Sequence, residues 1–259
     1  MSTPTAEMQF TQTATDRLEV NKVESGAALQ WLSSGFEDFK RTPALSLLYG
    51  LLFASLTAGV FLLVTNVPWY AVAYLTGLVV MGPFMASDLY AASRDMQQGR
   101  EATIDNSLRL LIKRSTNLAL FATLLALVMA AWVRISALLF AVKFSTLTPS
   151  IEAYTSLFSS AEGWITMSYF VGIGFLLVTS VFVISAVAIP AILDKDVDFI
   201  TAMQTSYRAV THNPGAMASW AVMIVALTAV GVMTAFVGFA VLFPILGYAT
   251  WHSYRSLVK

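Results

Sequence analysis

The sequence predicts an all-α protein that crosses a membrane as a polytopic bundle of six helices. Apolar residues make up 57% of its 259 positions, and only 12% are charged, against about 25% in an average soluble domain. The mean hydropathy of +0.71 agrees with these figures. Of the 15 Lys and Arg residues, all but Arg134 and Lys143, that is thirteen, fall on one side of the membrane in the six-span topology.

The six predicted spans follow from the lengths of the apolar blocks, because a helix needs about 20 mostly apolar residues to cross the hydrocarbon core. They cover about 43–65, 67–92, 117–142, 164–193, 214–232 and 235–252. The last two divide one apolar block that is too long for a single crossing, and we expect it to turn near 231–238. An odd number of spans would scatter the basic residues, so the positive-inside rule supports this split. Both termini are then cytoplasmic, and the expected location is the bacterial inner membrane.

The residues before the first span divide into two parts. Residues 1–27 are polar and Thr-rich, which predicts a disordered N-terminal arm and not a signal peptide. Residues 28–42 predict an amphipathic helix in the membrane interface, and residues 43–259 form the transmembrane domain. The apolar positions of the interfacial helix are Ala28, Trp31, Leu32, Phe36 and Phe39, and its charged positions Glu37, Asp38 and Lys40 are expected elsewhere on the wheel.

Two cytoplasmic connections also predict amphipathic helices. Thr103 is expected to cap one helix between the second and third spans, and Asp198 another between the fourth and fifth. These helices can either lie on the bilayer and pack under the bundle, or offer a surface to a partner protein. Base rates for amphipathic helices favour the first interpretation.

Several short strings along the chain occur together. They are Trp31 with GFEDF at 35–39 and Pro43, SLLYG at 46–50, Gly82-Pro83 with Leu89-Tyr90 and Ser93-Arg94, Ile189-Pro190 with Asp194, and PILGYATWHSYR at 244–255. From about residue 30 to the C-terminus, this pattern resembles the proteobacterial integral membrane proteins grouped as domain of unknown function 2189. The resemblance implies an uncharacterised inner-membrane protein with no established active site. Some relatives carry a label that links them to cytochrome c oxidase.

Prolines recur in the three spans that run toward the cytoplasm, as Pro83, Pro190 and Pro244. Each leaves a helical carbonyl without its donor, which predicts a kink. A short Ser–Leu/Tyr–Arg element follows each proline, at 107–109, 206–208 and 253–255. The two features together suggest a parallel repeat of helical hairpins. The kinks fit a vestibule of a channel or transporter, and they fit a packed core equally well.

Ionisable residues near the membrane give the candidate sites. Asp88 and Arg134 lie toward the ends of their spans, and with Arg94 they could form a polar pathway or local ion pairs; snorkelling or ion pairing is favoured. His212 and His252 should lie at similar depth on neighbouring helices, so they could form a weak ligand pair. Two interfacial histidines with ordinary hydrogen bonds are the favoured alternative, and no metal or cofactor is expected.

Composition narrows the function class. The chain has no cysteine, two histidines and a formal charge of zero, so it is not a haem–copper catalytic subunit, and no nucleic-acid partner is expected. The aspartates at 194, 196 and 198 fail the calcium-loop pattern and fit helix capping better. We expect a non-enzymatic accessory or scaffold protein whose partners are the lipid bilayer and other membrane proteins or itself, with a respiratory complex as one candidate. The alternative is a homo-oligomeric channel or transporter for a small solute or ion.

Overall fold

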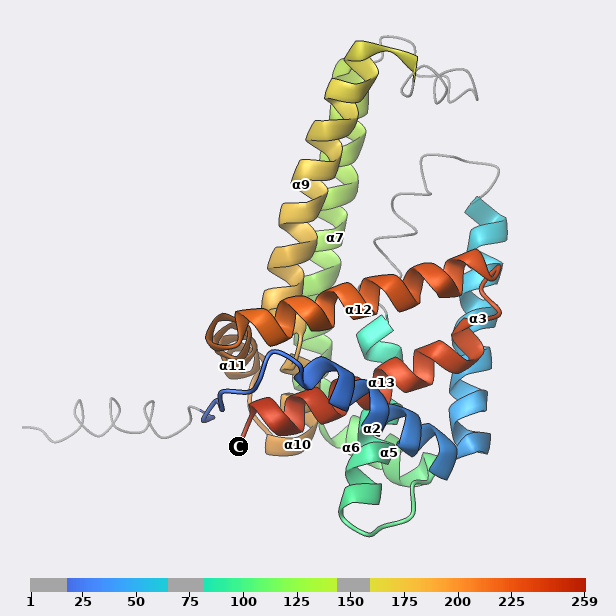
Figure 1. Cartoon of the computed structure of the whole chain (residues 1–259), viewed down its shortest axis with the longest axis vertical. Coiled ribbons are helices and arrows are strands. Elements are labelled where there is room, and N and C mark those ends of the chain that lie inside the picture. The colour runs from blue at the N-terminus through green and yellow to red at the C-terminus, as the bar shows by residue number, and fades with distance from the viewer. Residues whose placement is uncertain (1–17, 65–81, 144–158) are drawn as a thin grey trace, which may run out of the picture.

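The structure is a computed structural model that describes residues 18–64, 82–143 and 159–259. These residues form helices and connecting turns, which confirms the all-α prediction for this part of the chain, and no strand occurs in it (Figure 1). The helices are α2 (Ala27–Arg41), α3 (Pro43–Val64), α5 (Ser87–Gln97), α6 (Ile104–Lys113), α7 (Ser115–Lys143), α9 (Ala161–Ser185), α10 (Ala188–Lys195), α11 (Phe199–His212), α12 (Pro214–Met233) and α13 (Phe239–Leu257).

Four segments of the described residues are long and apolar enough to cross a membrane, where the sequence predicted six. They are Pro43–Leu62, Ser115–Ile135, Gly163–Lys195 and Pro214–Met233. The predicted second span, 67–92, lies largely outside the described residues. The predicted sixth span lies in α13, which is surrounded by other helices and buries twelve of its 19 residues. Six spans and cytoplasmic termini therefore remain predictions.

The split of the last apolar block is confirmed. Helix α12 ends at Met233 and α13 begins at Phe239. The turn between them places Ala235 and Phe236 at φ values of 51° and 68°, so two non-glycine residues adopt the left-handed conformation. Gly231 and Gly238 have a different role, because the Phe239 ring and the Thr234 side chain occupy the space where their side chains would lie.

The sequence predicts one continuous helix for the fourth span, but the structure has two helices there. Helix α9 ends at Ser185, and α10 begins at Ala188. Pro190 explains the break, because it cannot donate to the carbonyl of Ala186. The Ser206 hydroxyl of α11 bridges the gap: it accepts from the Val187 N–H at 3.4 Å and donates to the Val183 carbonyl at 2.9 Å.

Helix α13 is the centre of the fold, and α2 and α3 make their most extensive contacts with it. Two glycines permit this approach. A Cβ on Gly35 of α2 would stand 2.6 Å from the Ala249 nitrogen and the Ile245 oxygen, and a Cβ on Gly50 of α3 would overlap the Ala240 backbone. Ala240 is four residues before Pro244, so its carbonyl lacks a helical donor. Gly50 packs against this free carbonyl, where any larger residue would collide.

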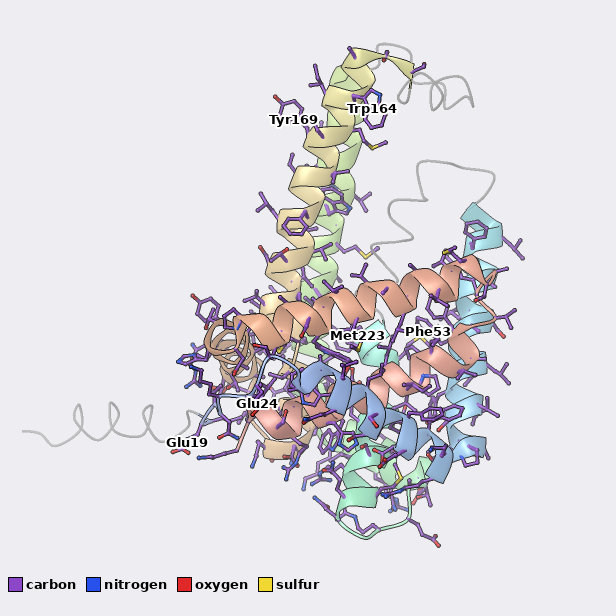
Figure 2. All side chains as sticks on the ribbon, viewed as in Figure 1. Glu19, Glu24, Phe53, Trp164, Tyr169 and Met223 are labelled. Carbon is purple, nitrogen blue, oxygen red and sulfur yellow. The ribbon has the colours of Figure 1, made fainter. Side chains whose placement is uncertain are left out.

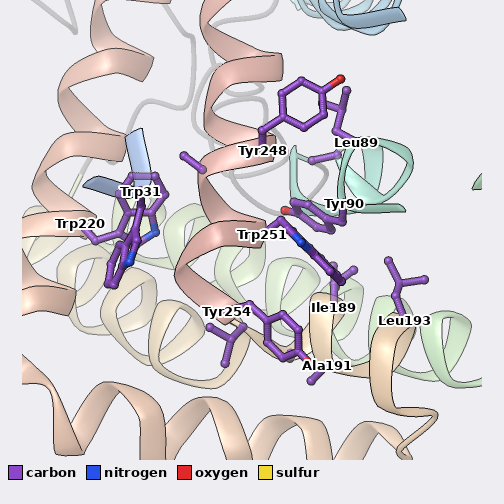
Figure 3. Packing of buried hydrophobic residues seen from close by; sticks show 14 of the residues in the cluster. Trp31, Leu89, Tyr90, Ile189, Ala191, Leu193, Trp220, Tyr248, Trp251 and Tyr254 are labelled. Atoms are coloured by element: carbon purple, nitrogen blue, oxygen red, sulfur yellow. The ribbon is translucent and has the colours of Figure 1, made fainter. Parts of the chain in front are cut away.

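Aromatic residues fill both sides of α13. Trp31 of α2 and Trp220 of α12 meet edge to face, with ring centroids 5.8 Å apart. In Figure 3, Tyr248, Trp251 and Tyr254 project from the other side of α13 toward α5 and α10. All five side chains are nearly inaccessible to solvent, so α13 is enclosed by protein on both sides.

Helices α7 and α9 run side by side and extend well beyond the other helices (Figure 1). Gly174 of α9 faces the Trp132 ring of α7, which a Cβ would meet at 3.2 Å. Toward the outer end of α9, Tyr169 points away from the hairpin (Figure 2), and Trp164 and Tyr169 are 58% and 61% exposed. Aromatic residues at such positions are typical of membrane–water interfaces.

Part of the predicted N-terminal arm packs against the C-terminus. Residues 18–26 are ordered beside the C-terminus: Val20 pairs with Val258, and the Asn21 N–H donates to the Leu257 carbonyl at 2.8 Å. Asn213 holds the same segment, since its side chain accepts from the Val23 N–H at 2.8 Å and donates to the Asn21 carbonyl at 2.9 Å. The polar composition of residues 1–27 did not predict these backbone contacts. The rest of the predicted arm, 1–17, lies outside the described residues.

Replacing Ser206 with alanine should destabilise the protein by about 1–3 kcal/mol, because the Val187 N–H and the Val183 carbonyl would both lose a buried partner. Unfolding in mixed micelles, followed by tryptophan fluorescence, measures this loss. Ser180→Ala is the matched control, since the exposed Ser180 hydroxyl only donates to the Leu176 carbonyl of its own helix. It should stay within about 0.5 kcal/mol of the wild type. Equal effects of the two changes would contradict the bridging role of Ser206.

Candidate functional site

A layer of polar side chains surrounds the C-terminal half of α13. It divides into two groups, which we call the Asp38 cluster and the arginine cluster. The Asp38 cluster consists of Asp38, Ser93, Gln97, Trp251 and His252, and the arginine cluster consists of Arg94, Arg114, Asp194, Asp196, Tyr254 and Arg255. Helix α5 contributes to both clusters because Ser93 and Gln97 face α2 and α13 while Arg94 reaches α10.

The Asp38 cluster is built around a buried carboxylate of α2. Asp38 is only 4% exposed, and its Oδ2 accepts from the Ser93 hydroxyl at 2.5 Å and from His252 Nε2 at 2.8 Å. Two donors satisfy the carboxylate, as burial of a charged group requires. The interaction therefore joins α2, α5 and α13 at one oxygen atom.

The hydrogen bonds of this cluster fix the tautomer of His252. The indole N–H of Trp251 donates to Gln97 Oε1 at 3.0 Å, and an indole nitrogen can only donate. Gln97 must then turn its amide nitrogen toward His252 Nδ1, which lies 3.4 Å away and has to accept. The ring consequently carries its proton on Nε2 and donates it to Asp38.

A hydroxyl group lies one helical turn further along the same interface. The Tyr248 hydroxyl is 3.0 Å from both Thr42 Oγ1 and Ser46 Oγ. Beyond it, the Tyr49 hydroxyl of α3 lies close to the Asp88 carboxyl of α5. Asp88 therefore pairs with a tyrosine on a neighbouring helix, and its backbone carbonyl accepts from the Ser107 hydroxyl at 3.4 Å.

The arginine cluster is centred on Asp194 at the end of α10. Its Oδ1 accepts from Arg94 at 3.2 Å, and its Oδ2 accepts from Tyr254 at 2.9 Å and from Arg255 at 3.3 Å. Burial, and next the charge of Asp194, raise the pKa of Tyr254 above its usual value, so this hydroxyl stays protonated and donates. Arg114 pairs with Asp196 on the same side.

The candidate site residues predicted from the sequence lie in different parts of the structure. Arg94 pairs with Asp194 and Asp88 with Tyr49, so no described contact joins Arg94 to Asp88. Arg134 is exposed on α7. His212 contacts the Arg208 carbonyl of its own helix at 2.8 Å, whereas His252 belongs to the Asp38 cluster. The two histidines share no partner among the described residues, and the ligand pair stays a prediction.

The helix-cap predictions are confirmed. Thr103 accepts from the Asn106 N–H at 3.3 Å at the start of α6. Asp198 accepts from the backbone N–H groups of Ile200 and Thr201 at 2.9 and 3.0 Å at the start of α11. Burial alone would raise the pKa of Asp198, but these bonds and that of the Thr201 hydroxyl lower it. The residues that the structure describes contain no group of three or more His, Asp or Glu placed to hold a metal ion.

Sequence reasoning placed Asp38 on the wrong side of its helix. Trp31, Gly35 and Asp38 share the buried face of α2, while Phe36, predicted to be on the apolar face, is 46% exposed. The spacing of Asp38 from Trp31 and Gly35, seven and three residues, already put it on their stripe. Ser93, Gln97 and Trp251 gave no signal, because their roles depend on contacts between helices far apart in the sequence.

The donor and acceptor directions in the Asp38 cluster predict that the protonation of the His252 ring changes when Gln97 becomes glutamate. A carboxylate in place of the amide would still accept from Trp251, and its negative charge would favour a proton on His252 Nδ1. Nitrogen NMR of the labelled ring should show the proton on Nε2 in the wild type and an additional proton on Nδ1 in Gln97→Glu. Gln97→Leu is the control and should gain no proton on Nδ1, because it adds no negative charge. A wild-type ring protonated on Nδ1 alone would contradict the assignment.

Comparison with known proteins supports a membrane protein. No curated protein and no solved structure matches the chain. A family model described as "Predicted integral membrane protein (DUF2189)" matches residues 71–194, which run from the predicted second span to Asp194 of the arginine cluster. The strings quoted from 31–50 and 244–255 lie outside this match. The resemblance is confirmed over residues 71–194, where the chain is similar to the domain of unknown function 2189 family of predicted integral membrane proteins.

Proposed function

We propose that this integral membrane protein is a non-enzymatic accessory or scaffold subunit that binds other membrane proteins through its α7–α9 hairpin. The single observation that carries the proposal is the projection of this hairpin beyond the rest of the described helices (Figure 1). It joins the body through its inner end, and along its length it exposes large apolar side chains. Examples are Leu127, Leu138, Phe175 and Leu176, each at least 65% exposed.

Small residues on α9 support a protein partner as well as lipid. Ser168 and Gly172 are both exposed and stand four residues apart, which is the small-xxx-small spacing of close helix pairs in membranes. A Cβ on Gly172 would meet no atom within 4 Å. Nothing in the described fold requires a glycine there, in contrast to Gly174, which accommodates Trp132. Gly172 is therefore free to accommodate a helix of another subunit.

The polar layer supports a structural role in place of a catalytic one. Asp38 and Asp194, its two most buried carboxylates, are each engaged by donors from other helices. Such pairing holds helices together. A membrane subunit of a respiratory complex is the candidate partner that the family resemblance suggests, and self-association is the alternative within the same proposal.

Gly172→Leu should weaken association with the partner by at least about tenfold, or ~1.4 kcal/mol, because the larger side chain keeps a facing helix at a distance. Co-purification in a mild detergent, quantified by mass spectrometry, measures the loss. Gly59→Leu on α3 is the matched control, since Gly59 is also exposed and has open space around it. Both variants should keep wild-type thermal stability. An unchanged set of partners in Gly172→Leu would overturn the proposal.

A channel or transporter for a small solute or ion is the second candidate. It is favoured by the row of polar groups between α3, α5 and α13, which starts at the Asp88–Tyr49 pair and continues through Tyr248 and its two hydroxyl partners. Polar side chains in such a position are typical of ion pathways.

For this candidate, Asp88→Asn should abolish flux of a monovalent cation or proton into liposomes that contain the protein, while the fold is retained. Fluorescent ion indicators inside the liposomes provide the measurement. Asp105→Asn is the control because Asp105 is exposed on α6 and pairs only with Arg109 among the described residues. Flux that is absent from the wild type, or equal in both variants, would exclude a path through Asp88.

A further inference from the structure

Arg114 is an unusual residue of the arginine cluster. It lies at the junction of α6 and α7, and its side chain is only 10% exposed. One guanidinium nitrogen pairs with Asp196, but Nε is buried and has no hydrogen-bond partner among the described residues. A guanidinium group has five donors, and leaving one of them buried and unpaired is destabilising.

The surroundings of Arg114 hold more positive than negative charge. Arg94 is near enough that its charge, after burial, lowers the pKa of the Arg114 guanidinium. The counter-charges are Asp194 and Asp196, and Asp194 is already shared by Arg94, Arg255 and Tyr254. Three guanidinium groups thus face two carboxylates. The cluster has capacity for one more anion.

The position of the cluster indicates where that anion comes from. Arg114 directly precedes the candidate span that begins at Ser115, and Asp194 lies at the end of the candidate span that closes at Lys195. Span ends lie at the depth of the lipid headgroups. The first turn of α7 adds free backbone N–H groups and the positive end of a helix of 29 residues. Arg255 is 45% exposed and Asp196 61% exposed, so the cluster is open on one side.

We infer that the arginine cluster binds the phosphate group of an anionic phospholipid, with Arg94 and Arg114 as its principal ligands. A phosphate oxygen would accept from the unpaired Nε of Arg114 and offset the repulsion between the two guanidinium groups. Basic pockets between membrane helices bind anionic headgroups in this manner. Bound lipid would join the junction of α6 and α7 to α5, α10 and α13. The inference does not depend on the proposed scaffold function.

Native mass spectrometry of the purified protein tests the site. The protein is reconstituted in nanodiscs of phosphatidylcholine alone or of an equal mixture with phosphatidylglycerol. Retained phosphatidylglycerol and a higher melting temperature in the mixture are expected for the wild type. Arg114→Gln should bind this lipid about tenfold more weakly or worse, as expected for loss of a charge-assisted hydrogen bond. Arg114→Lys, which keeps the charge but not the Nε donor, should also bind more weakly.

Arg109→Gln is the matched control. It removes the same charge from α6, but Arg109 is 77% exposed and bonds Asp105, so lipid retention should match that of the wild type. If Arg114→Gln fails to fold, Arg94→Gln provides the same comparison. Equal loss in Arg109→Gln would show general surface attraction and overturn the site. Stabilisation of the detergent-solubilised protein by inorganic phosphate, without retention of phosphatidylglycerol, would overturn the lipid assignment.

Discussion

The close approach of α2 and α3 to α13 is the constraint on which the rest of the structure depends. Gly35 and Gly50 let two helices touch the α13 backbone, and at Gly50 the contact is with the carbonyl that Pro244 leaves free. Close contact of this kind strengthens van der Waals packing, which is the main force between helices when the surroundings are apolar. It also brings Asp38 and Ser46 within hydrogen-bond reach of His252 and Tyr248. The polar layer exists because the backbones are near.

Two of the three predicted kink prolines, Pro190 and Pro244, lie where neighbouring helices make contact. At Pro190 the Ser206 hydroxyl of α11 bridges the interrupted helix, and at Pro244 the free carbonyl receives Gly50. The serines of the predicted repeat support this interpretation in two units, since Ser107 bonds the Asp88 carbonyl of α5 as Ser206 bonds the Val183 carbonyl of α9. Ser253 differs, because it bonds Thr250 within its own helix. In two of the three elements, therefore, the serine contacts the backbone of a helix that precedes it in the chain, and the repeat itself stays a prediction.

Charge is distributed unevenly between the two parts of the molecule. The polar layer gathers the paired carboxylates and arginines beside α5, α10 and α13, whereas the α7–α9 hairpin exposes apolar side chains and small residues. The charged pairs are thus concentrated beside the inner end of the hairpin, while apolar side chains are exposed on the hairpin and also on α3 and α12. The arginine cluster lies where the two parts meet, because Arg114 ends the connection to α7.

The sequence by itself determined the helical class, the membrane setting, the turn that divides 214–251 and the caps at Thr103 and Asp198, because these depend on hydropathy, helical period and local hydrogen bonding. It could not determine that α13 is the enclosed centre, since a central helix and a lipid-facing helix of similar composition look alike. It also misplaced Asp38, and it grouped Arg94 with Asp88 and Arg134, whereas in the structure Arg94 pairs with Asp194. Those pairings join residues up to 214 positions apart, and only tertiary packing, set by where glycine permits close approach, brings them together.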